Sequence, residues 1–136
     1  MYALSDEHPT HGVKALKLEL YPFNTPDYPG LAPIIKDNNW SDFKELRFDI
    51  FNPAEKNVTV SVRIDDGKDY PEYEERYNNR FILEPGINNI RVPLNTLVTS
   101  GTARTLNLRK IYRLLLFMAN PEKKVVLHVD YIRLIR

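Results

Sequence analysis

The chain has 136 residues, with 19 Lys and Arg against 18 Asp and Glu, and it contains no cysteine. A net charge of +1 with both signs interspersed gives no broad field for nucleic acid or an anionic membrane. The lack of cysteine excludes a disulfide framework, a thiolate metal site and a cysteine nucleophile. The length predicts one domain over residues 1–136, large enough to bury about two-thirds of its unfolded surface.

Hydropathy excludes two further features. No apolar run approaches the roughly 20 residues that cross a bilayer, and no basic and then apolar leader opens the chain. The sequence as given therefore predicts neither a membrane span nor a signal peptide. Excision of the domain from a longer, exported protein stays open.

The first predicted strand covers 13–21, where Leu16, Leu18 and Leu20 alternate with polar residues. Four prolines between 22 and 33 then break regular pairing, and only 31–35 offers a short strand. Strands are next predicted over 45–51 and 56–65. The short turn between them predicts an adjacent antiparallel pair.

A polar, tyrosine-rich connection over 66–79 separates these strands from the next two. Strands at 80–83 and 88–93 flank Glu84-Pro85-Gly86, which predicts a hairpin. Residues 94–113 fit one or two helical turns as well as an irregular edge. The apolar run 114–118 indicates a buried central strand, and alternation over 125–135 predicts the last strand.

Strands with one apolar and one polar face predict two antiparallel sheets packed face to face, because each apolar face must be covered. The fold class is therefore predicted as an all-β, two-sheet antiparallel sandwich. The alternation places seven side chains in its core: Leu18, Phe48, Val60, Val62, Ile90, Leu116 and Val129.

Eight motifs are spread along nearly the whole chain, at 10–12, 28–30, 40–43, 48–53, 63–66, 76–78, 85–88 and 130–134. They resemble those of bacterial carbohydrate-binding-module-like domains of the galactose-binding-like β-jelly-roll superfamily. The resemblance implies a jelly roll that is often part of a larger secreted or membrane-anchored protein. It also implies an extracytoplasmic location, whether secreted, periplasmic or attached to a membrane protein.

Two features depart from that pattern. Such domains usually have a short strand before the turn at Thr10, and here only about nine residues precede it, so a trimmed domain and a short first strand are both open. The family's last strand commonly carries Asp-Asn, whereas Asp130 is followed by Tyr131, which leaves the acidic position intact.

Glycan recognition needs aromatic rings that stack on sugar C–H surfaces and planar polar groups that bond hydroxyls. The connection after Asp66 alternates tyrosines with charged and amide residues, next to Arg63 and Asp65. A neutral or weakly acidic saccharide is predicted to bind there with micromolar to millimolar affinity. The candidate ligand-binding residues are Arg63, Asp65, Asp66, Tyr73, Arg76, Tyr77, Asn78 and Trp40.

Structural roles for the same residues stay open. The arginines and carboxylates would then form a salt-bridge network that holds the long loop on the sheet, and the tyrosines would cover a core edge. For Trp40, the sole tryptophan, core packing is favoured over ligand stacking.

Catalytic signatures are weak. Asp65 and Asp66 are adjacent and point to opposite faces of a strand, which does not suit two carboxylates that flank one glycosidic bond about 5–9.5 Å apart. A nucleophile elbow, a phosphate loop and a zinc-protease helix are missing from the sequence. A zinc site of His8, His11 and His128 is conceivable, but three unrelated histidines are the favoured interpretation.

The resemblance also implies a structural calcium where the turn after the first strand meets the last strand. The matching residues are Thr10, Gly12 and Asp130, with Asp6 or Glu7 as helpers. Alternatively, Asp130 only pairs with Arg133 or Lys14.

Together these points predict a non-catalytic module that binds carbohydrate, with other domains of the same polypeptide as further partners. The alternative is a domain of the same fold that mediates protein–protein contact or assembly in a larger envelope protein. A large, flat apolar patch would favour the alternative.

Overall fold

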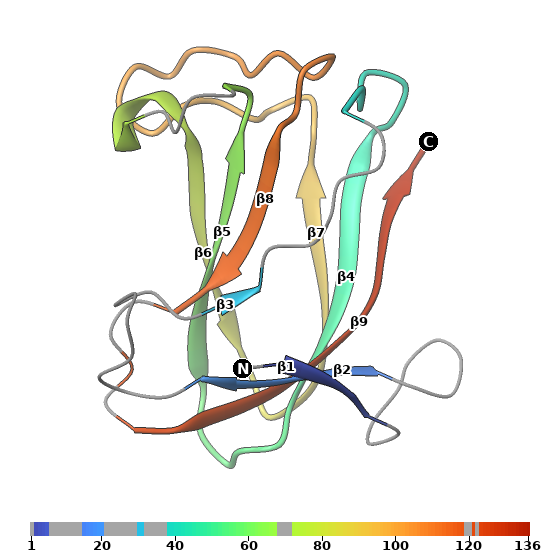
Figure 1. Cartoon of the computed structure of the whole chain (residues 1–136), viewed down its shortest axis with the longest axis vertical. Coiled ribbons are helices and arrows are strands. Elements are labelled where there is room, and N and C mark those ends of the chain that lie inside the picture. The colour runs from blue at the N-terminus through green and yellow to red at the C-terminus, as the bar shows by residue number, and fades with distance from the viewer. Residues whose placement is uncertain are drawn as a thin grey trace.

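The computed structural model describes residues 2–5, 15–20, 30–31, 38–67, 72–118, 121 and 123–136. These residues form nine strands and one short 3₁₀ helix, η1 (Figure 1). The bounds are β1 Tyr2–Ser5, β2 Ala15–Leu20, β3 Gly30–Leu31, β4 Glu45–Asn52, β5 Val58–Asp65, η1 Tyr73–Glu75, β6 Tyr77–Leu83, β7 Gly86–Pro93, β8 Arg113–Phe117 and β9 Val125–Ile135.

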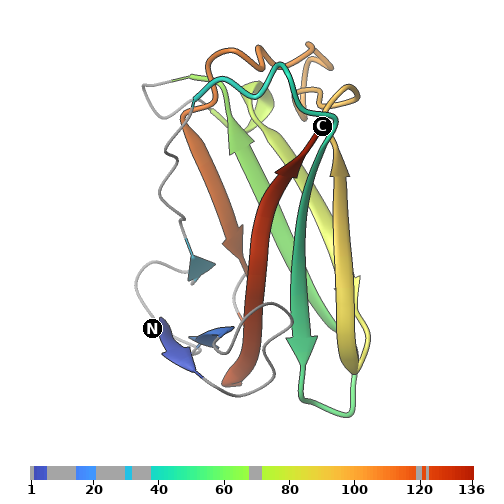
Figure 2. The ribbon, with the colours of Figure 1, turned by 90° about the vertical axis from the view of Figure 1, so that its right-hand side faces the viewer.

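The strands make two antiparallel sheets that face each other. The first has the order β1-β2-β9-β4-β7 and the second the order β3-β8-β5-β6. In Figure 2 the strands β9, β4 and β7 lie in front of β8, β5 and β6. The predicted all-β sandwich is confirmed. Among the described residues, no helix is long and apolar enough to cross a membrane.

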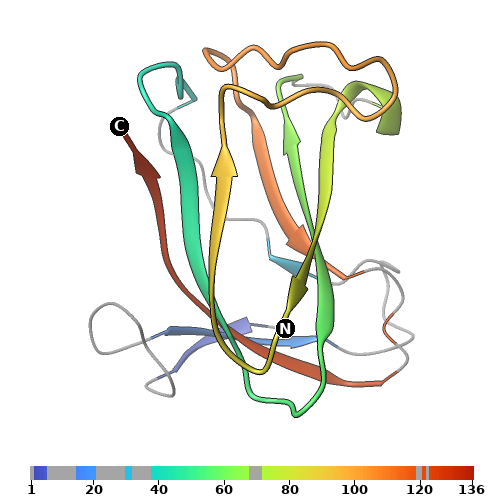
Figure 3. The same ribbon diagram turned by 180° about the vertical axis from the view of Figure 1, so that it is seen from behind.

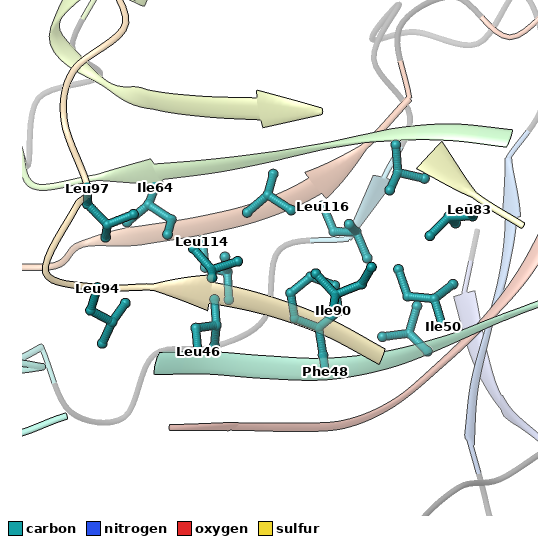
Figure 4. Packing of buried hydrophobic residues seen from close by; sticks show 14 of the residues in the cluster. Leu46, Phe48, Ile50, Ile64, Leu83, Ile90, Leu94, Leu97, Leu114 and Leu116 are labelled. Atoms are coloured by element: carbon teal, nitrogen blue, oxygen red, sulfur yellow. The ribbon is translucent and has the colours of Figure 1, made fainter. Parts of the chain in front are cut away.

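The core follows directly from the alternation. In β5, Val60, Val62 and Ile64 are buried, while Ser61 and Arg63 between them lie on the other side of the sheet. Each of the seven predicted core residues is at most 8% exposed. Such side chains interdigitate between the sheets (Figure 4), and burial of each contributes about 1.5–3 kcal/mol to folding.

Two predicted strand pairings are wrong. β4 pairs with β7 and β9, and β5 pairs with β6 and β8, so the turn between β4 and β5 crosses from one sheet to the other. The predicted hairpin at Glu84-Pro85-Gly86 likewise joins β6 of one sheet to β7 of the other. A short polar turn can cross the about 10 Å between packed sheets as easily as it can join neighbours in one sheet.

Buried Asn52 holds these two crossings together. Its amide nitrogen donates to the carbonyl oxygens of Lys56 at 3.0 Å and Leu83 at 3.3 Å, and its amide oxygen accepts from the backbone of Ala54 at 3.0 Å. One side chain at the end of β4 therefore bonds to backbone at the end of β6. These contacts replace the ladder that a hairpin would have supplied.

A short strand, β1, precedes the strand predicted at 13–21. β1 pairs with β2, and β2 pairs with β9 with Leu18 opposite Leu127. The predicted central strand is also confirmed, because β8 lies between β3 and β5. Of the strand predicted at 31–35, Leu31 belongs to β3 and the rest lies outside the described residues.

The connection between β7 and β8 runs across one end of the sandwich and lies beside η1 there (Figures 1 and 3). It contains no helix in its described residues, only an isolated bridge between Val98 and Thr105. The candidate site lies near this end of the sandwich, on the outer side of β5.

Candidate ligand-binding face

The outward side of the second sheet carries most of the polar chemistry near the predicted site. Strand register places Arg63 between Asn78 of β6 and Leu115 of β8, and Ser61 between Arg80 and Phe117. Paired residues in a sheet share one side. We call this surface the β6-β5-β8 face, and its residues are Thr59, Ser61, Arg63, Asp65, Asn78, Arg80, Ile82, Arg113, Leu115 and Phe117.

Asp65 lies beneath two arginines on this face. Arg63 donates from Nε to Oδ1 and from Nη2 to Oδ2, both at 2.8 Å, and Arg113 donates from Nη1 to Oδ2 at 2.8 Å. The Asp65 side chain is 0% exposed, whereas those of Arg63 and Arg113 are 14% and 22% exposed. The two guanidinium groups therefore cover the carboxylate, and a ligand would meet N–H donors and positive charge.

Asp66 instead bonds to the connection between β7 and β8. Its carboxylate accepts from Arg104 Nη1 and Nη2 at 2.8 and 3.0 Å, and from the backbone of Asn107 at 2.8 Å. Burial by itself raises the pKa of the Asp66 carboxyl, but these hydrogen bonds outweigh it and hold the pKa below its ordinary value of 3.8. The carboxylate in turn raises the pKa of Arg104. Asp66 thus attaches the β7–β8 connection to the end of β5.

The same connection holds η1. The backbone nitrogen of Gly101 donates to Glu74 O at 3.1 Å and that of Ser100 donates to Arg76 O at 2.9 Å. A Cβ at Gly101 would lie 2.4 Å from Glu74 Cβ, so only glycine permits this approach. The chain beside the candidate face is therefore anchored at several points.

The predicted tyrosines take different positions. Tyr73 is 54% exposed at the end of the sandwich, and the Arg76 guanidinium carbon lies 5.6 Å from its ring centroid. Tyr77 points inward and packs against the core, where burial raises the pKa of its phenol. Asn78 lies on the face beside Arg63, and its amide nitrogen donates to Ser100 Oγ at 3.3 Å.

Trp40 is a core residue at 3% exposure, and its backbone nitrogen donates to Leu108 O at 2.6 Å. The candidate role of stacking on a ligand is therefore wrong for Trp40, because its ring has no open surface. Direct ligand contact is also wrong for Asp65, since the guanidinium groups cover it. The structure brings Arg63 and Asn78 together on the face and puts Asp66, Tyr73 and Arg76 at its end.

Seven residues of the face were not among the predicted ligand-binding residues, and three of them lie on β8: Arg113, Leu115 and Phe117. The apolar run 114–118 indicated a buried central strand; β8 is central, but only Leu114 and Leu116 of it are buried, and Leu115 and Phe117 are part-exposed. The run is apolar throughout and does not alternate, so the only signal was the two-residue period of a strand counted from polar Arg113, which puts Leu115 and Phe117 on the same side as that arginine.

The predicted metal site is described only in part. Asp130 in β9 lies opposite Asp49 in β4, and its Oδ1 accepts from the Tyr131 backbone at 2.8 Å. Thr10, Gly12, Asp6, Glu7 and the histidines His8 and His11 lie outside the described residues. Within the described ranges, no group of three or more His, Asp or Glu residues could hold a metal ion. Two carboxylates in one register position are hard oxygen donors of the type that Ca²⁺ prefers.

The Asp66 anchor yields a pH prediction. We expect Asp66→Asn to lower the free energy of unfolding at pH 7 by about 1 kcal/mol, because charge-assisted bonds to Arg104 are lost and that arginine is part-exposed. A carboxyl whose pKa is lowered in the folded state stabilises above its unfolded pKa and loses that contribution as pH falls through its folded pKa. The difference from wild type should therefore shrink as the pH falls below the ordinary carboxyl pKa of 3.8 and through the lower pKa of the folded state. Urea unfolding from pH 2.5 to 7 measures it.

Glu55→Gln, at an exposed turn position, is the matched control and should change little at any pH. A difference between wild type and Asp66→Asn that persists undiminished at pH 2.5 would contradict the assignment.

Comparisons with known proteins find similarity in structure. No protein-family model matches the sequence, and no curated protein matches it either. A family 11 carbohydrate-binding module from Clostridium thermocellum, in complex with a β-1,3-1,4-mixed-linked tetrasaccharide, has a TM-score of 0.74 at 18% identity over 99% of this chain and 81% of that chain. A family 30 module of a cellulosomal cellulase from the same organism has a TM-score of 0.60 at 11% identity, over 98% and 80%.

An exo-β-agarase also matches, with a TM-score of 0.72 at 17% identity over 98% of this chain and 22% of the agarase. The likeness thus concerns one part of that enzyme. The chain has the jelly-roll β-sandwich fold of carbohydrate-binding modules.

Proposed function

We propose that the chain is a non-catalytic carbohydrate-binding module that binds a glycan on the β6-β5-β8 face. The observation that carries the proposal is the register of Arg63 with Asn78 on one side and Leu115 on the other, next to Phe117. This places planar hydrogen-bonding groups beside an apolar surface, the combination that sugar hydroxyls and C–H faces require. The similar family 11 module, which is complexed with a tetrasaccharide, supports the same class of ligand.

The non-catalytic part of the proposal is supported by the state of the adjacent carboxylates. Asp65 is covered by Arg63 and Arg113, and Asp66 is bonded to Arg104 and Asn107. A general acid or a nucleophile in glycoside hydrolysis must reach the glycosidic bond. Neither the Asp65 nor the Asp66 carboxylate is free to reach a glycosidic bond in this arrangement.

Isothermal titration against a panel of soluble polysaccharides tests the binding function. We expect micromolar to millimolar affinity and a loss of about 2- to 10-fold in Asn78→Ala, the equivalent of one hydrogen bond. Asn89→Ala is the matched control, because Asn89 is exposed on the outer side of the other sheet, opposite Asp49. Equal effects of the two substitutions, or no binding to any polysaccharide, would remove the function from this face.

We also propose that Ca²⁺ stabilises the fold through Asp130, with Thr10 and Gly12 as further ligands and Asp49 close by. A metal that binds only the native state adds about 2.7 kcal/mol at a hundredfold excess over its dissociation constant. EDTA should therefore lower the melting temperature, and Asp130→Asn should abolish that response while exposed Asp42→Asn retains it. An identical melt with EDTA and with excess Ca²⁺ would contradict the metal site.

A module that binds a polysaccharide must be in the same compartment as that polysaccharide, and the proposed ligand class is found outside the cytoplasm. We therefore propose an extracytoplasmic location, secreted, periplasmic or attached to a membrane protein, as one domain of a larger polypeptide.

A further inference from the structure

The β6-β5-β8 face carries more positive charge than the chain as a whole. Three arginines, Arg63, Arg80 and Arg113, point outward from its three strands, against the one carboxylate of Asp65. The chain overall has a net charge of +1. In the described range 72–76, the acidic residues before β6 belong to η1 and its flank at the end of the sandwich, where Glu75 pairs with Arg104. The middle of the face is thus a local excess of guanidinium groups.

The Asp65 carboxylate is not accessible to a ligand. Asp65 is 0% exposed, and both of its oxygens accept hydrogen bonds from the arginines above it. Arg63 uses Nε and Nη2 for this, so Nη1 and the second hydrogen of Nη2 are left to bond outward. Above Asp65, the described residues of the face therefore present hydrogen-bond donors to a ligand.

Arg80 adds a second guanidinium group beside the first. It lies opposite Ser61, one diagonal step from Arg63, which in a sheet corresponds to about 7–8 Å between positions. Arg80 is exposed, and its side chain makes no ion pair with any residue in the described part of the chain. Two like charges at this spacing repel each other unless an anion lies between them.

We propose that the glycan bound at this face is acidic, a polysaccharide whose uronate carboxylates are bound by Arg63 and Arg80. This inference rests on the proposed carbohydrate-binding function and names its ligand class. A planar guanidinium matches a carboxylate in a two-point fork, and charge-assisted bonds are about twice as strong as neutral ones. Arg63 already makes such a fork with Asp65. A neutral glycan offers hydroxyls only and brings no opposite charge to Arg80.

The experiment compares one polymer backbone with and without its charge. Titration of the protein with polygalacturonate and with fully methyl-esterified polygalacturonate should show about tenfold tighter binding of the acid form, which corresponds to about 1.4 kcal/mol. Raising NaCl from about 50 to about 500 mM should weaken only the acid form, because the arginines are solvent-accessible and salt screens them. Dextran sulfate is the third ligand and should bind less tightly than polygalacturonate.

Matched variants locate the effect. Arg80→Gln should weaken polygalacturonate binding about 5- to 10-fold, the loss of one charge-assisted contact, without weakening the ester. Arg91→Gln is the control, because Arg91 is an exposed arginine on β7, the edge strand of the other sheet. It should leave binding of both polymers unchanged. Melting curves of both variants should match wild type.

Each of four other results would contradict a different part of the proposal. Equal, salt-independent binding of acid and ester overturns the acidic-ligand inference and leaves the carbohydrate-binding function standing. Tighter binding of dextran sulfate overturns the choice of carboxylate. Equal losses in Arg80→Gln and Arg91→Gln overturn the assignment to this face. An absence of binding to all three polymers and to the wider neutral panel overturns the proposed function itself.

Discussion

Replacing Asp65 with alanine is expected to lower the free energy of unfolding by about 3 kcal/mol, the lower end of the range for removing one member of a buried ion pair. The carboxylate is fully buried, and it pairs with both Arg63 and Arg113. Without it, two guanidinium groups repel each other across neighbouring strands. The cost stays near the lower end because both arginines are part-exposed and can turn toward water. Urea denaturation at pH 7 measures the change.

Asp65→Asn separates charge from shape. The amide keeps one acceptor oxygen in the same place but loses the negative charge, so an intermediate loss is expected. Glu55→Ala, at an exposed position, should change stability by less than about 0.5 kcal/mol. An Asp65→Ala variant as stable as Glu55→Ala would show that the Arg63–Asp65–Arg113 cluster contributes nothing to folding.

Replacing Phe48 with alanine is expected to lower the free energy of unfolding by about 3–5 kcal/mol, the usual cost of truncating a buried aromatic ring. Phe48 extends from β4 into the core between the two sheets (Figure 4) and is 3% exposed. Its removal leaves a cavity that rigid strands on both sides cannot close. The midpoint of urea unfolding and the melting temperature should fall together.

Two controls bracket this value. Phe48→Leu retains most of the volume and should cost less than about 1.5 kcal/mol. Ile82→Ala removes an apolar side chain that is 67% exposed on β6 and should be nearly neutral. A loss below 1 kcal/mol for Phe48→Ala, as measured against these two variants, would contradict the packing around β4.

Part of the candidate site could be predicted from sequence and part could not. The outward position of Arg63 follows from its place between Val62 and Ile64, since alternate residues of a strand face opposite sides. The partner of Asp66 did not follow, because Arg104 is 38 residues away and reaches it through a connection without regular structure. Arg113 was missed because it is 48 residues from Asp65 in the chain and lies opposite it only through the pairing of β5 with β8.

Local alternation in the sequence alone determined that this protein is made of strands and, in the strands that alternate, which side chains face the core and which face outward. That information is local, because the two-residue period of a strand assigns every side chain to a face before any partner is chosen. The tertiary structure decided which strands are neighbours, that the turns after β4 and β6 cross between sheets, and that Asp65 lies buried between two arginines. These features depend on contacts between residues distant in the chain, and an alternating strand can pair equally well at either edge with any strand of matching pattern. The charge of the β6-β5-β8 face therefore emerged only when β6, β5 and β8 came together.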